Sequence, residues 1–524
     1  MFRSRDTRRA VIGQRSPAVS RRASVTNIES ASPRSAQLRA EEPRSNTANR
    51  QSAEGSKHRS LQDLIDDVPS IVEHLFNDAV APHARPNPER TPVPLEFSNW
   101  RDEQRSWRET AVLFDQSHHM PELFIQGPDA RALLSRVAIN SLDNLAPGRA
   151  KQLVGCNARG QLIGDCVLHD LGNERFELIS GMPLLNWVHF LAESERLDVA
   201  IERDNNTADN PTGGRLQFRF GMDGPHAGDI FAEVVKGEAP DIPFFCTRRV
   251  EIAGCQVLAL RHGMAGHKGV ELSGPYEQRD VVRSAILHAG EKYGIRRGGS
   301  RTYFSASIES GWIGYPLPAL YTGDDLADFR RWLPADGWEA NFQMGGSYFS
   351  RDIEDYYLTA YDMGYGGIIK YDHDFIGREA LSAIREEQPR AKVTLVWDDE
   401  DVSRILDSLM GTELPYKYLD RPVADYVLAQ VDEVRSETGD RIGYSTHCCY
   451  SINERQQLSL AIVDRAFAEP GTRVTLIWGE ADGGSRKSRV ERHRQIEVRA
   501  TVAPVPYAKA ASAMKKAAIG KDRG

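Results

Sequence analysis

Residues 113–120 read LFDQSHHM, which places an acid, an amide and two adjacent histidines directly after an apolar run. On a strand, neighbouring side chains point to opposite faces, so His118 and His119 cannot readily share one metal ion. Asp115 and His119 would meet only on a helix, and no third ligand is near, so we expect no metal. Two interpretations stay open. Either one histidine is buried and the other faces solvent, or Gln116 and one histidine line a pocket.

A second polar cluster is RRGGSRTYFSASIESGW, residues 296–312. If this segment is an extended strand, Arg301, Tyr303, Ser305 and Ser307 share one face. Burying four unpaired polar groups is costly, so that face would meet solvent or a polar ligand. Tyr303 is then a plausible general acid, because a nearby cation lowers the pKa of a phenol. A half-exposed strand without a ligand is the alternative.

A third feature is Glu271, which stands between Val270 and Leu272 in a short apolar strand. A carboxylate in such a position normally has a fixed partner. The partner could be the N–H pair of an amino-pyrimidine ring such as a pterin. It could equally be an arginine in a structural ion pair, and the residues alone leave both possibilities open.

Composition narrows the class of protein. The chain has 524 residues and a net charge of −8, but residues 1–60 contain 13 Lys or Arg against 5 Asp or Glu, which leaves −16 on the rest. An acidic body argues against a nucleic-acid partner. No apolar run reaches the length of a membrane span, and Met1 is not followed by a secretory signal. The six cysteines form no CxxC pair, which indicates a reducing compartment and no structural zinc. We expect a cytoplasmic protein whose oligomeric state the sequence leaves open.

The organisation of the chain follows from its patterning. Residues 1–60 are Arg/Ser-rich and too poor in apolar residues to fold, so we expect a disordered tail. The same composition resembles a transit peptide, which would make the protein organellar. Residues 61–388 read as an α+β catalytic region of two interleaved subdomains, and 389–510 as a small β-barrel domain. A basic tail, 511–524, ends the chain.

Three segments repeat one layout of strand, Gly-Pro turn and helix. They are ELFIQGPDARALLSRV, RLQFRFGMDGPHAGDIFAEVV and GVELSGPYEQRDVVRSAILHAG. The repetition predicts duplicated subdomains on mixed sheets rather than one doubly wound sheet. The common signatures of nucleotide sites, HExxH metalloproteases and GxSxG hydrolases are absent from the sequence.

Several segments, taken in order, resemble one family. They are FSNWRDEQRSWRETAVLFDQSHHM, ALRHGMAG, ESGWIGYPLPALYTG, DIEDYY, KYDHDFIGREAL and VAPVPY. Together they are similar to the tetrahydrofolate-dependent aryl O-demethylases, which act on vanillate, 3-O-methylgallate and syringate. That family belongs to the superfamily of the glycine-cleavage aminomethyltransferase. The resemblance covers about residues 60–510 and implies an aminomethyltransferase-like fold.

The resemblance also implies roles for single residues. Tyr303 in GSRTY corresponds to the catalytic acid, and Gln116 and His119 correspond to a substrate-pocket wall, with His119 inward and His118 outward. Glu271 corresponds to the pterin-binding glutamate. Two further cofactor-side positions are Trp312 of ESGW and Asp165 of GQLIGD, the latter without the catalytic role that it has in aminomethyltransferases.

Two departures from the family pattern stand out. In SGMPLLNW, Met182 occupies the place where the vanillate enzymes carry an arginine suited to a substrate carboxylate. Either Arg301 or His267 replaces that arginine, or the substrate lacks the carboxylate. The second departure is THCCYSIN, residues 446–453, where smaller or apolar residues are expected.

The implied activity is methyl transfer from a methoxylated, lignin-derived aromatic to tetrahydrofolate, giving a phenol and 5-methyltetrahydrofolate. One alternative is an aminomethyltransferase or an N- or S-demethylase acting on a glycine-type or sulfonium substrate. Another is a folate-binding protein without catalytic activity. In each case the expected partners are small molecules, with no nucleic acid and no membrane.

Overall fold

Two sheets, a barrel and the helices around them position the candidate residues. The computed structural model describes residues 58–79, 92–210, 214–263, 269–484, 486–487, 489–509 and 511. The expected tails therefore lie almost wholly outside the described residues, as does His267. Within the described residues, no helix is long and apolar enough to cross a membrane.

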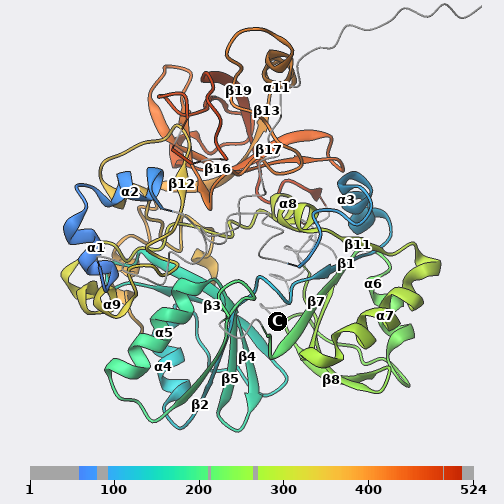
Figure 1. The fold of residues 1–524 in the computed structure, drawn as a ribbon. Helices are drawn as coiled ribbons and strands as arrows, with labels where there is room; N and C mark the ends of the chain where they lie inside the picture. Colours follow the sequence, from blue (N-terminus) through green and yellow to red (C-terminus); the bar gives the residue numbers. More distant parts are fainter. Residues whose placement is uncertain are drawn as a thin grey trace, which may run out of the picture. The chain divides into compact units, whose positions relative to one another are not determined.

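The first sheet has five antiparallel strands. In spatial order they are β3 (Ala150–Cys156), β4 (Leu162–Gly172), β5 (Arg175–Ser180), β2 (Glu122–Gln126) and β6 (Ala200–Asp204). Helices α4 (Ala130–Val137) and α5 (Met182–Ser194) pack on this sheet, as Figure 1 shows.

The second sheet has six strands and is mixed, since β1 pairs in parallel with β11. The spatial order is β11 (Arg296–Gly298), β1 (Val112–Asp115), β7 (Gln217–Asp223), β10 (Val270–Pro275), β9 (Cys255–Leu260) and β8 (Thr247–Ile252). Helices α6 (Ala227–Val234) and α7 (Arg279–Gly290) pack against each other beside this sheet (Figure 1).

The predicted repeat of strand, turn and helix is confirmed as β2–α4, β7–α6 and β10–α7. In the first two turns, Gly127 and Gly224 adopt φ of 148° and 120°. A Cβ at Gly127 would lie 2.3 Å from the carbonyl oxygen of Asp198, and one at Gly224 would lie 2.7 Å from that of Thr110. Only glycine fits a turn that is both left-handed and this tightly packed.

The C-terminal part closes into a six-stranded barrel, as predicted. Its strands, in spatial order, are β13 (Arg390–Trp397), β17 (Gln456–Asp464), β16 (Arg441–Ser451), β15 (Asp432–Arg435), β18 (Arg473–Trp478) and β19 (Ile496–Ala503). Helix α11 (Asp399–Asp407) packs on β17 and β19. The two sheet subdomains, of which only the second is mixed, and this barrel together form the predicted α+β fold.

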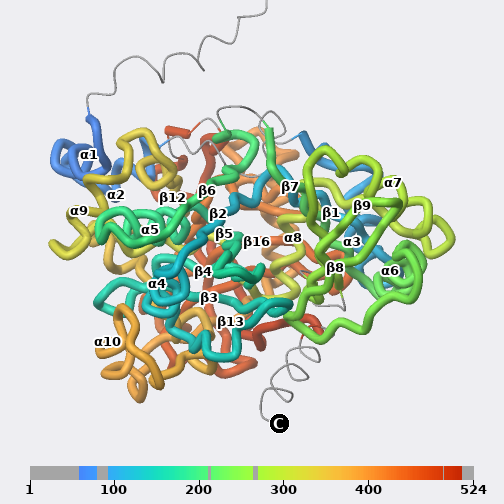
Figure 2. The backbone as a smooth tube through the Cα atoms, turned by 90° about the horizontal axis from the view of Figure 1, so that it is seen from below, coloured from blue at the N-terminus to red at the C-terminus, as the bar shows by residue number. Residues whose placement is uncertain are grey.

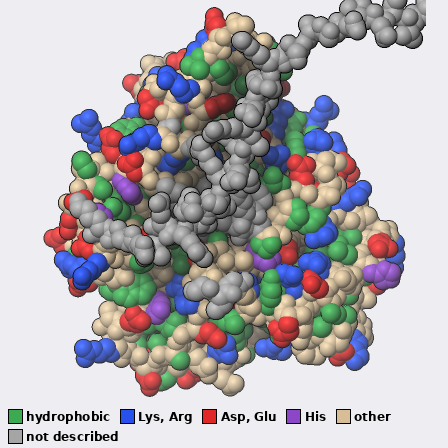
Figure 3. All heavy atoms as spheres, viewed as in Figure 1, with side chains coloured by type: hydrophobic (Ala, Val, Ile, Leu, Met, Phe, Trp, Pro, Cys, Tyr) green, Lys and Arg blue, Asp and Glu red, His purple; other side chains and the backbone are tan. Residues whose placement is uncertain are grey.

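Smaller elements complete the described fold. They are α1 (Leu61–Asp67), α2 (Ile71–Asn77), α3 (Trp100–Glu109), α9 (Ala327–Trp332), α10 (Arg378–Ala383), β12 (Met344–Gly345) and β14 (Ala429–Gln430). The space-filling view in Figure 3 shows acidic and basic side chains interspersed over the face in view, without a gathering of one sign.

The prediction of an extended strand at residues 300–310 is wrong. This segment is the helix α8 (Ser300–Ser310), which ends at Gly311 with φ of 75°. Its polar side chains are satisfied within the helix, because Ser305 donates to the carbonyl of Thr302 at 2.7 Å and Ser307 to that of Phe304 at 3.3 Å. Hydroxyls that bond to the preceding turn remove the argument for a polar strand face.

Helix α8 lies between the second sheet and the barrel, in contact with α3 and with β16 (Figure 2). Residues three or four apart share a helix face, so Tyr303 and Ser307 point the same way and Arg301 does not. The sheet and the barrel together therefore fix the direction in which Tyr303 points.

One buried guanidinium joins the two sheets. Arg219 on β7 is 1% exposed and donates to Glu271 of its own sheet at 2.6 Å. It also donates to Glu122 at 3.0 Å and to Glu177 at 2.7 Å, and both of these carboxylates belong to the first sheet. Removing the cation would leave three buried carboxylates facing one another.

We predict that Arg219→Met lowers the free energy of unfolding by about 3–5 kcal/mol, because uncompensated buried charge remains. Chemical denaturation of the variant and of the wild type measures this. The matched control is Arg473→Met at an exposed position on β18, which should stay within about 0.5 kcal/mol of the wild type. Equal stability of the two variants would contradict the role of Arg219 as the link.

Candidate active site

Tyr303 lies at the centre of the candidate site. Its hydroxyl accepts a hydrogen bond from Nε2 of Gln116 at 3.3 Å. Its ring lies 4.6 Å from the ring of His119 and 5.3 Å from that of Phe114, centroid to centroid. Phe114 and Gln116 are two residues apart along the line of β1, so both face α8. The structure thus brings together Tyr303, Gln116 and His119, as the sequence predicts.

Gln116 presents an unsatisfied acceptor at this site. The residue is 1% exposed, and its buried Oε1 has no hydrogen-bond partner among the described residues. The amide fits because residue 221 on β7 is glycine: a Cβ there would lie 3.2 Å from Nε2 of Gln116. A buried polar atom without a partner is costly, so Oε1 is placed to accept a hydrogen from a ligand.

One of the two histidines differs from the prediction. His118 was expected to face outward, but it is 4% exposed. Its Nδ1 lies 2.9 Å from the Thr207 hydroxyl, and Arg279 lies 3.4 Å from its Nε2. Burial lowers the pKa of His118 to about 4, so it is neutral near pH 7. Strand alternation ends at Asp115, which is why the outward assignment fails.

The environment of Tyr303 also departs from the prediction. Burial raises the pKa of its phenol, and the hydrogen bond from Gln116 partly opposes this. The predicted neighbouring cation does not act here, since Arg301 donates to Glu96 at 3.2 Å and lies 3.8 Å from Asp420. The helical geometry explains this, because residues 301 and 303 lie on different faces of α8. Tyr303 is therefore neutral near pH 7 and keeps its phenol proton.

Glu271 forms the ion pair that one of the two interpretations proposed. Its Oε1 accepts from Arg219 at 2.6 Å, and its Oε2 lies 3.8 Å from Nδ1 of His262. Burial opposes ionisation, yet Arg219 and His262 lower the pKa of Glu271 to about 2. The charge of Glu271 also raises the pKa of Tyr303, so the two groups act on each other. Arg219 thus binds Oε1, while Oε2 faces His262.

Asp165 and Trp312 lie together. Oδ2 of Asp165 accepts from Gln152 at 2.7 Å and from the hydroxyl of Tyr365 at 3.1 Å. Burial raises the pKa of this carboxyl, while hydrogen bonds from these residues and from Trp312 oppose the rise. The hydroxyl of Ser180 bonds to the backbone carbonyl of Asp165. This contact ties Asp165 to the start of α5, where Met182 lies.

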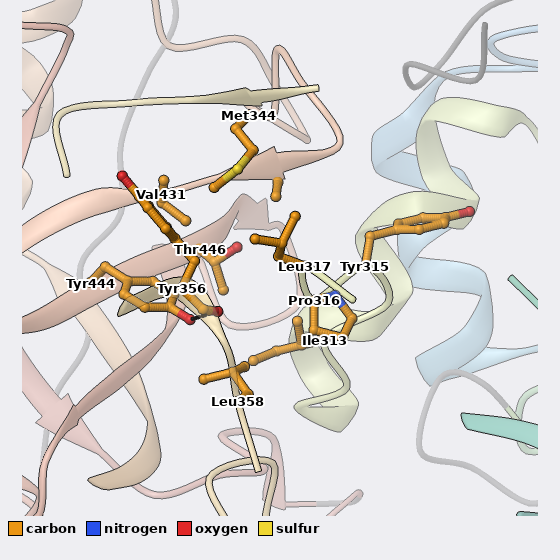
Figure 4. Close-up of a pocket in the computed structure, with 11 residues that line it drawn as sticks. Ile313, Tyr315, Pro316, Leu317, Met344, Tyr356, Leu358, Val431, Tyr444 and Thr446 are labelled. Atoms are coloured by element: carbon orange, nitrogen blue, oxygen red, sulfur yellow. Dashed lines mark hydrogen bonds between the residues drawn. The ribbon is translucent and has the colours of Figure 1, made fainter. Parts of the chain in front are cut away.

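A small, mostly apolar pocket lies between β16 and the segment after α8. Ile313, Leu317 and Leu358 line it together with Tyr356 and Tyr444 (Figure 4). Tyr315 also belongs to its wall but points away from Tyr444 in the same view. Tyr303 is not part of this wall, although Tyr315 contributes to the raised pKa of Tyr303. The cavity therefore adjoins the Tyr303 site without containing it.

Known proteins are similar in sequence to this chain over most of its length. The GCVT N-terminal domain family matches residues 85–317. Syringate O-demethylase of Sphingobium sp. (strain NBRC 103272 / SYK-6) is 44% identical over 449 residues, covering 86% of this chain and 96% of that protein. Sesamin methylene transferase of Sinomonas sp. (strain No.22) is 30% identical and covers 79% of this chain and 90% of its own length.

The chain belongs to the tetrahydrofolate-dependent aryl O-demethylases. It is therefore an enzyme, a methyltransferase of the aminomethyltransferase superfamily. The fold agrees with the superfamily: the aminomethyltransferase of the glycine cleavage system from Bartonella henselae superposes with a TM-score of 0.54 at 16% identity, covering 80% of this chain and 92% of that one.

One part of this O-demethylase was not predicted from the sequence. His447 has a left-handed φ of 52° and lies at a bulge in β16. Its Nε2 lies 2.7 Å from the Ser307 hydroxyl on α8, and its Nδ1 lies 2.8 Å from Oδ2 of Asp425. The departure at THCCYSIN therefore has a structural account, since it connects the barrel to the face of α8 that carries Tyr303. Only the unusual His-Cys-Cys run could have signalled it.

We predict that His118 makes the stability of this O-demethylase fall in acid. Below pH 6.5 the histidine of the unfolded chain becomes protonated. In the folded protein His118 has a pKa of about 4 and stays neutral over the same range. Stability contributed this way is complete above pH 6.5 and is lost as the pH falls towards 4.

The test compares the free energy of unfolding of wild type and His118→Gln from pH 7 to pH 4. The difference between the two should change by up to about 3 kcal/mol over this window. Titrations common to both proteins, such as those of Glu122 and Glu271, cancel in the difference. Parallel curves would mean that His118 titrates normally.

Proposed function

We propose that the Tyr303 site transfers the methyl group of a methoxylated aromatic ring, such as a lignin-derived methoxybenzoate, to tetrahydrofolate. The products would be a phenol and 5-methyltetrahydrofolate. The supporting observation is the buried Tyr303 hydroxyl, held by Gln116 and packed on His119, in a chain 44% identical to syringate O-demethylase. We also propose that the reaction takes place in the cytoplasm.

In this proposal Tyr303 supplies the proton that the departing phenolate needs. Because burial raises its pKa, the hydroxyl keeps its proton near neutral pH and can act as a donor. Gln116 donates to the same oxygen, so it stabilises the anion that Tyr303 becomes when the proton leaves. Gln116 Oε1 and His119 would orient the ring of the substrate.

The residues present fit a folate. The charged Glu271 offers Oε2 to an N–H donor, because Arg219 occupies Oε1. Trp312 and the buried Asp165 would form the cofactor-side wall. Tetrahydrofolate, when bound, supplies the amine that accepts the methyl group. The arrangement of two reactants in line accounts for much of the rate that such an enzyme needs.

The decisive experiment follows 5-methyltetrahydrofolate by mass spectrometry. The full-length protein is incubated with tetrahydrofolate and, separately, vanillate, syringate, guaiacol and dimethylglycine. We expect product from an aryl ether. Product from dimethylglycine alone would place the enzyme with the amine-acting relatives, and folate binding without any product would refute the proposed transfer from these ethers.

We predict that Tyr303→Phe lowers kcat by about 10²–10⁴-fold, because the proton donor is lost, while tetrahydrofolate affinity is unchanged. Steady-state kinetics and calorimetric folate titration measure the two quantities. The control is Tyr418→Phe, since Tyr418 is 40% exposed and belongs to the barrel region. Unchanged turnover in Tyr303→Phe would remove Tyr303 as the acid.

We predict that Glu271→Gln weakens tetrahydrofolate binding by about 10- to 100-fold, because a charged acceptor is lost. Glu177→Gln is the matched control, since Glu177 also binds Arg219 but from the first sheet. Calorimetric titration of both variants separates the roles. An equal loss in the two would mean that Glu271 acts only through Arg219.

A further inference from the structure

A half-buried arginine lies against Met182. Arg203 on β6 approaches the sulfur of Met182 with Nη2 at 3.6 Å. Its Nε donates to Oδ1 of Asn205 at 3.3 Å. Both partners are neutral, and across the described part of the chain Arg203 forms no ion pair with a carboxylate. A half-buried guanidinium without an anionic partner is unusual, because burial of a charge is costly unless it is paired.

The position of Arg203 joins two walls of the Tyr303 site. On one side, β6 pairs with β2, and two residues beyond Asn205 the backbone of Thr207 donates to the carbonyl of His118 at 3.0 Å. On the other side, Met182 begins α5 directly after the turn at Ser180, which bonds to Asp165. Arg203 therefore lies near the end of the first sheet at which the segment of Gln116 and His119 enters β2 and at which Asp165 and Met182 also lie.

The charge of Arg203 is preserved and incompletely balanced. Burial lowers its pKa to about 10, with Glu339 opposing, so the guanidinium remains a cation near pH 7. Glu339 acts at a distance and is itself bonded to Asn186 at 2.8 Å. Burial raises the pKa of the Glu339 carboxyl and so favours its neutral form. Glu339 is therefore a weak counter-ion for Arg203. An anion entering beside Met182 would complete the pair.

We propose that Arg203 binds the carboxylate of a methoxybenzoate and makes the enzyme selective for acids over neutral methoxyarenes. The inference rests on the proposed function and adds the residue that recognises the substrate. A planar guanidinium binds a carboxylate through two parallel hydrogen bonds, and among the described residues no carboxylate is bonded to Nη1 or Nη2. The sulfur of Met182 lies 3.6 Å from Nη2 and marks the side on which the carboxylate would bind. Arg301 donates to Glu96 instead, so it does not take the role of binding the substrate carboxylate.

The test compares syringate with 2,6-dimethoxyphenol, which has the same ring without the carboxylate. In Arg203→Met we expect the KM for syringate to rise by about 10- to 100-fold, as for loss of a charged hydrogen-bonding partner. The KM and kcat for 2,6-dimethoxyphenol should stay within about 3-fold of wild type. Arg203→Lys should recover part of the affinity for syringate, since it restores charge but not the paired geometry.

Turnover of the neutral phenol shows that each variant is folded, and Arg473→Met on the barrel serves as a charge-matched control. Equal losses with both substrates in Arg203→Met would overturn the proposal, because they would indicate a merely structural arginine. If the wild type transfers no methyl group from either compound, the proposed function fails. Calorimetric titration with syringate then still decides the role of Arg203: binding lost in Arg203→Met supports it, and binding retained overturns it.

Discussion

The arrangement of the whole catalytic half depends on one buried cation. Arg219 holds Glu271 of one sheet and Glu122 and Glu177 of the other, so the duplicated sheets meet through charge rather than through an apolar seam. Burial raises the pKa of Glu122 to about 7, whereas Arg219 keeps Glu271 ionised. The same contact therefore fixes the sheets and supplies a charged carboxylate to the site. A substitution that relaxed it would alter the fold and the proposed folate side together.

A second constraint sets the direction of α8. One end of its polar face contacts Gln116 through Tyr303, and one turn later Ser307 contacts His447 of the barrel. His447 has a left-handed backbone conformation at this contact. The other ring nitrogen of His447, Nδ1, contacts the carboxylate of Asp425. Strained residues persist where surrounding contacts over-determine them. The barrel thus takes part in positioning Tyr303, although it contributes no residue to the predicted substrate wall.

The elements that depend on local sequence patterns could be predicted from the sequence. The contacts of side chains with distant parts of the fold could not. Strand, turn and helix repeats and the barrel follow from periodicity and glycine, which act over a few residues. The helix at 300–310 was missed because its serines looked like a polar strand face, yet their hydroxyls bond one turn back. The grouping of Tyr303 with Gln116 came from family likeness. Neither Arg219 nor Arg203 could be chosen in advance, because their partners lie on other strands.

Near pH 7 Tyr303 is neutral and Glu271 is ionised. The two groups differ because their neighbours differ in charge. Burial acts on both groups in the same direction, towards the protonated form. At Tyr303 the neutral amide of Gln116 opposes burial, but the pKa of the phenol remains raised and the proton stays. Glu271 has a full positive charge at 2.6 Å, so its proton leaves. Because Glu271 also disfavours the tyrosinate, proton release from Tyr303 becomes easier when a cationic or N–H-rich ligand covers Glu271. In the proposed reaction, occupation of the folate side by tetrahydrofolate would therefore change the acidity of Tyr303.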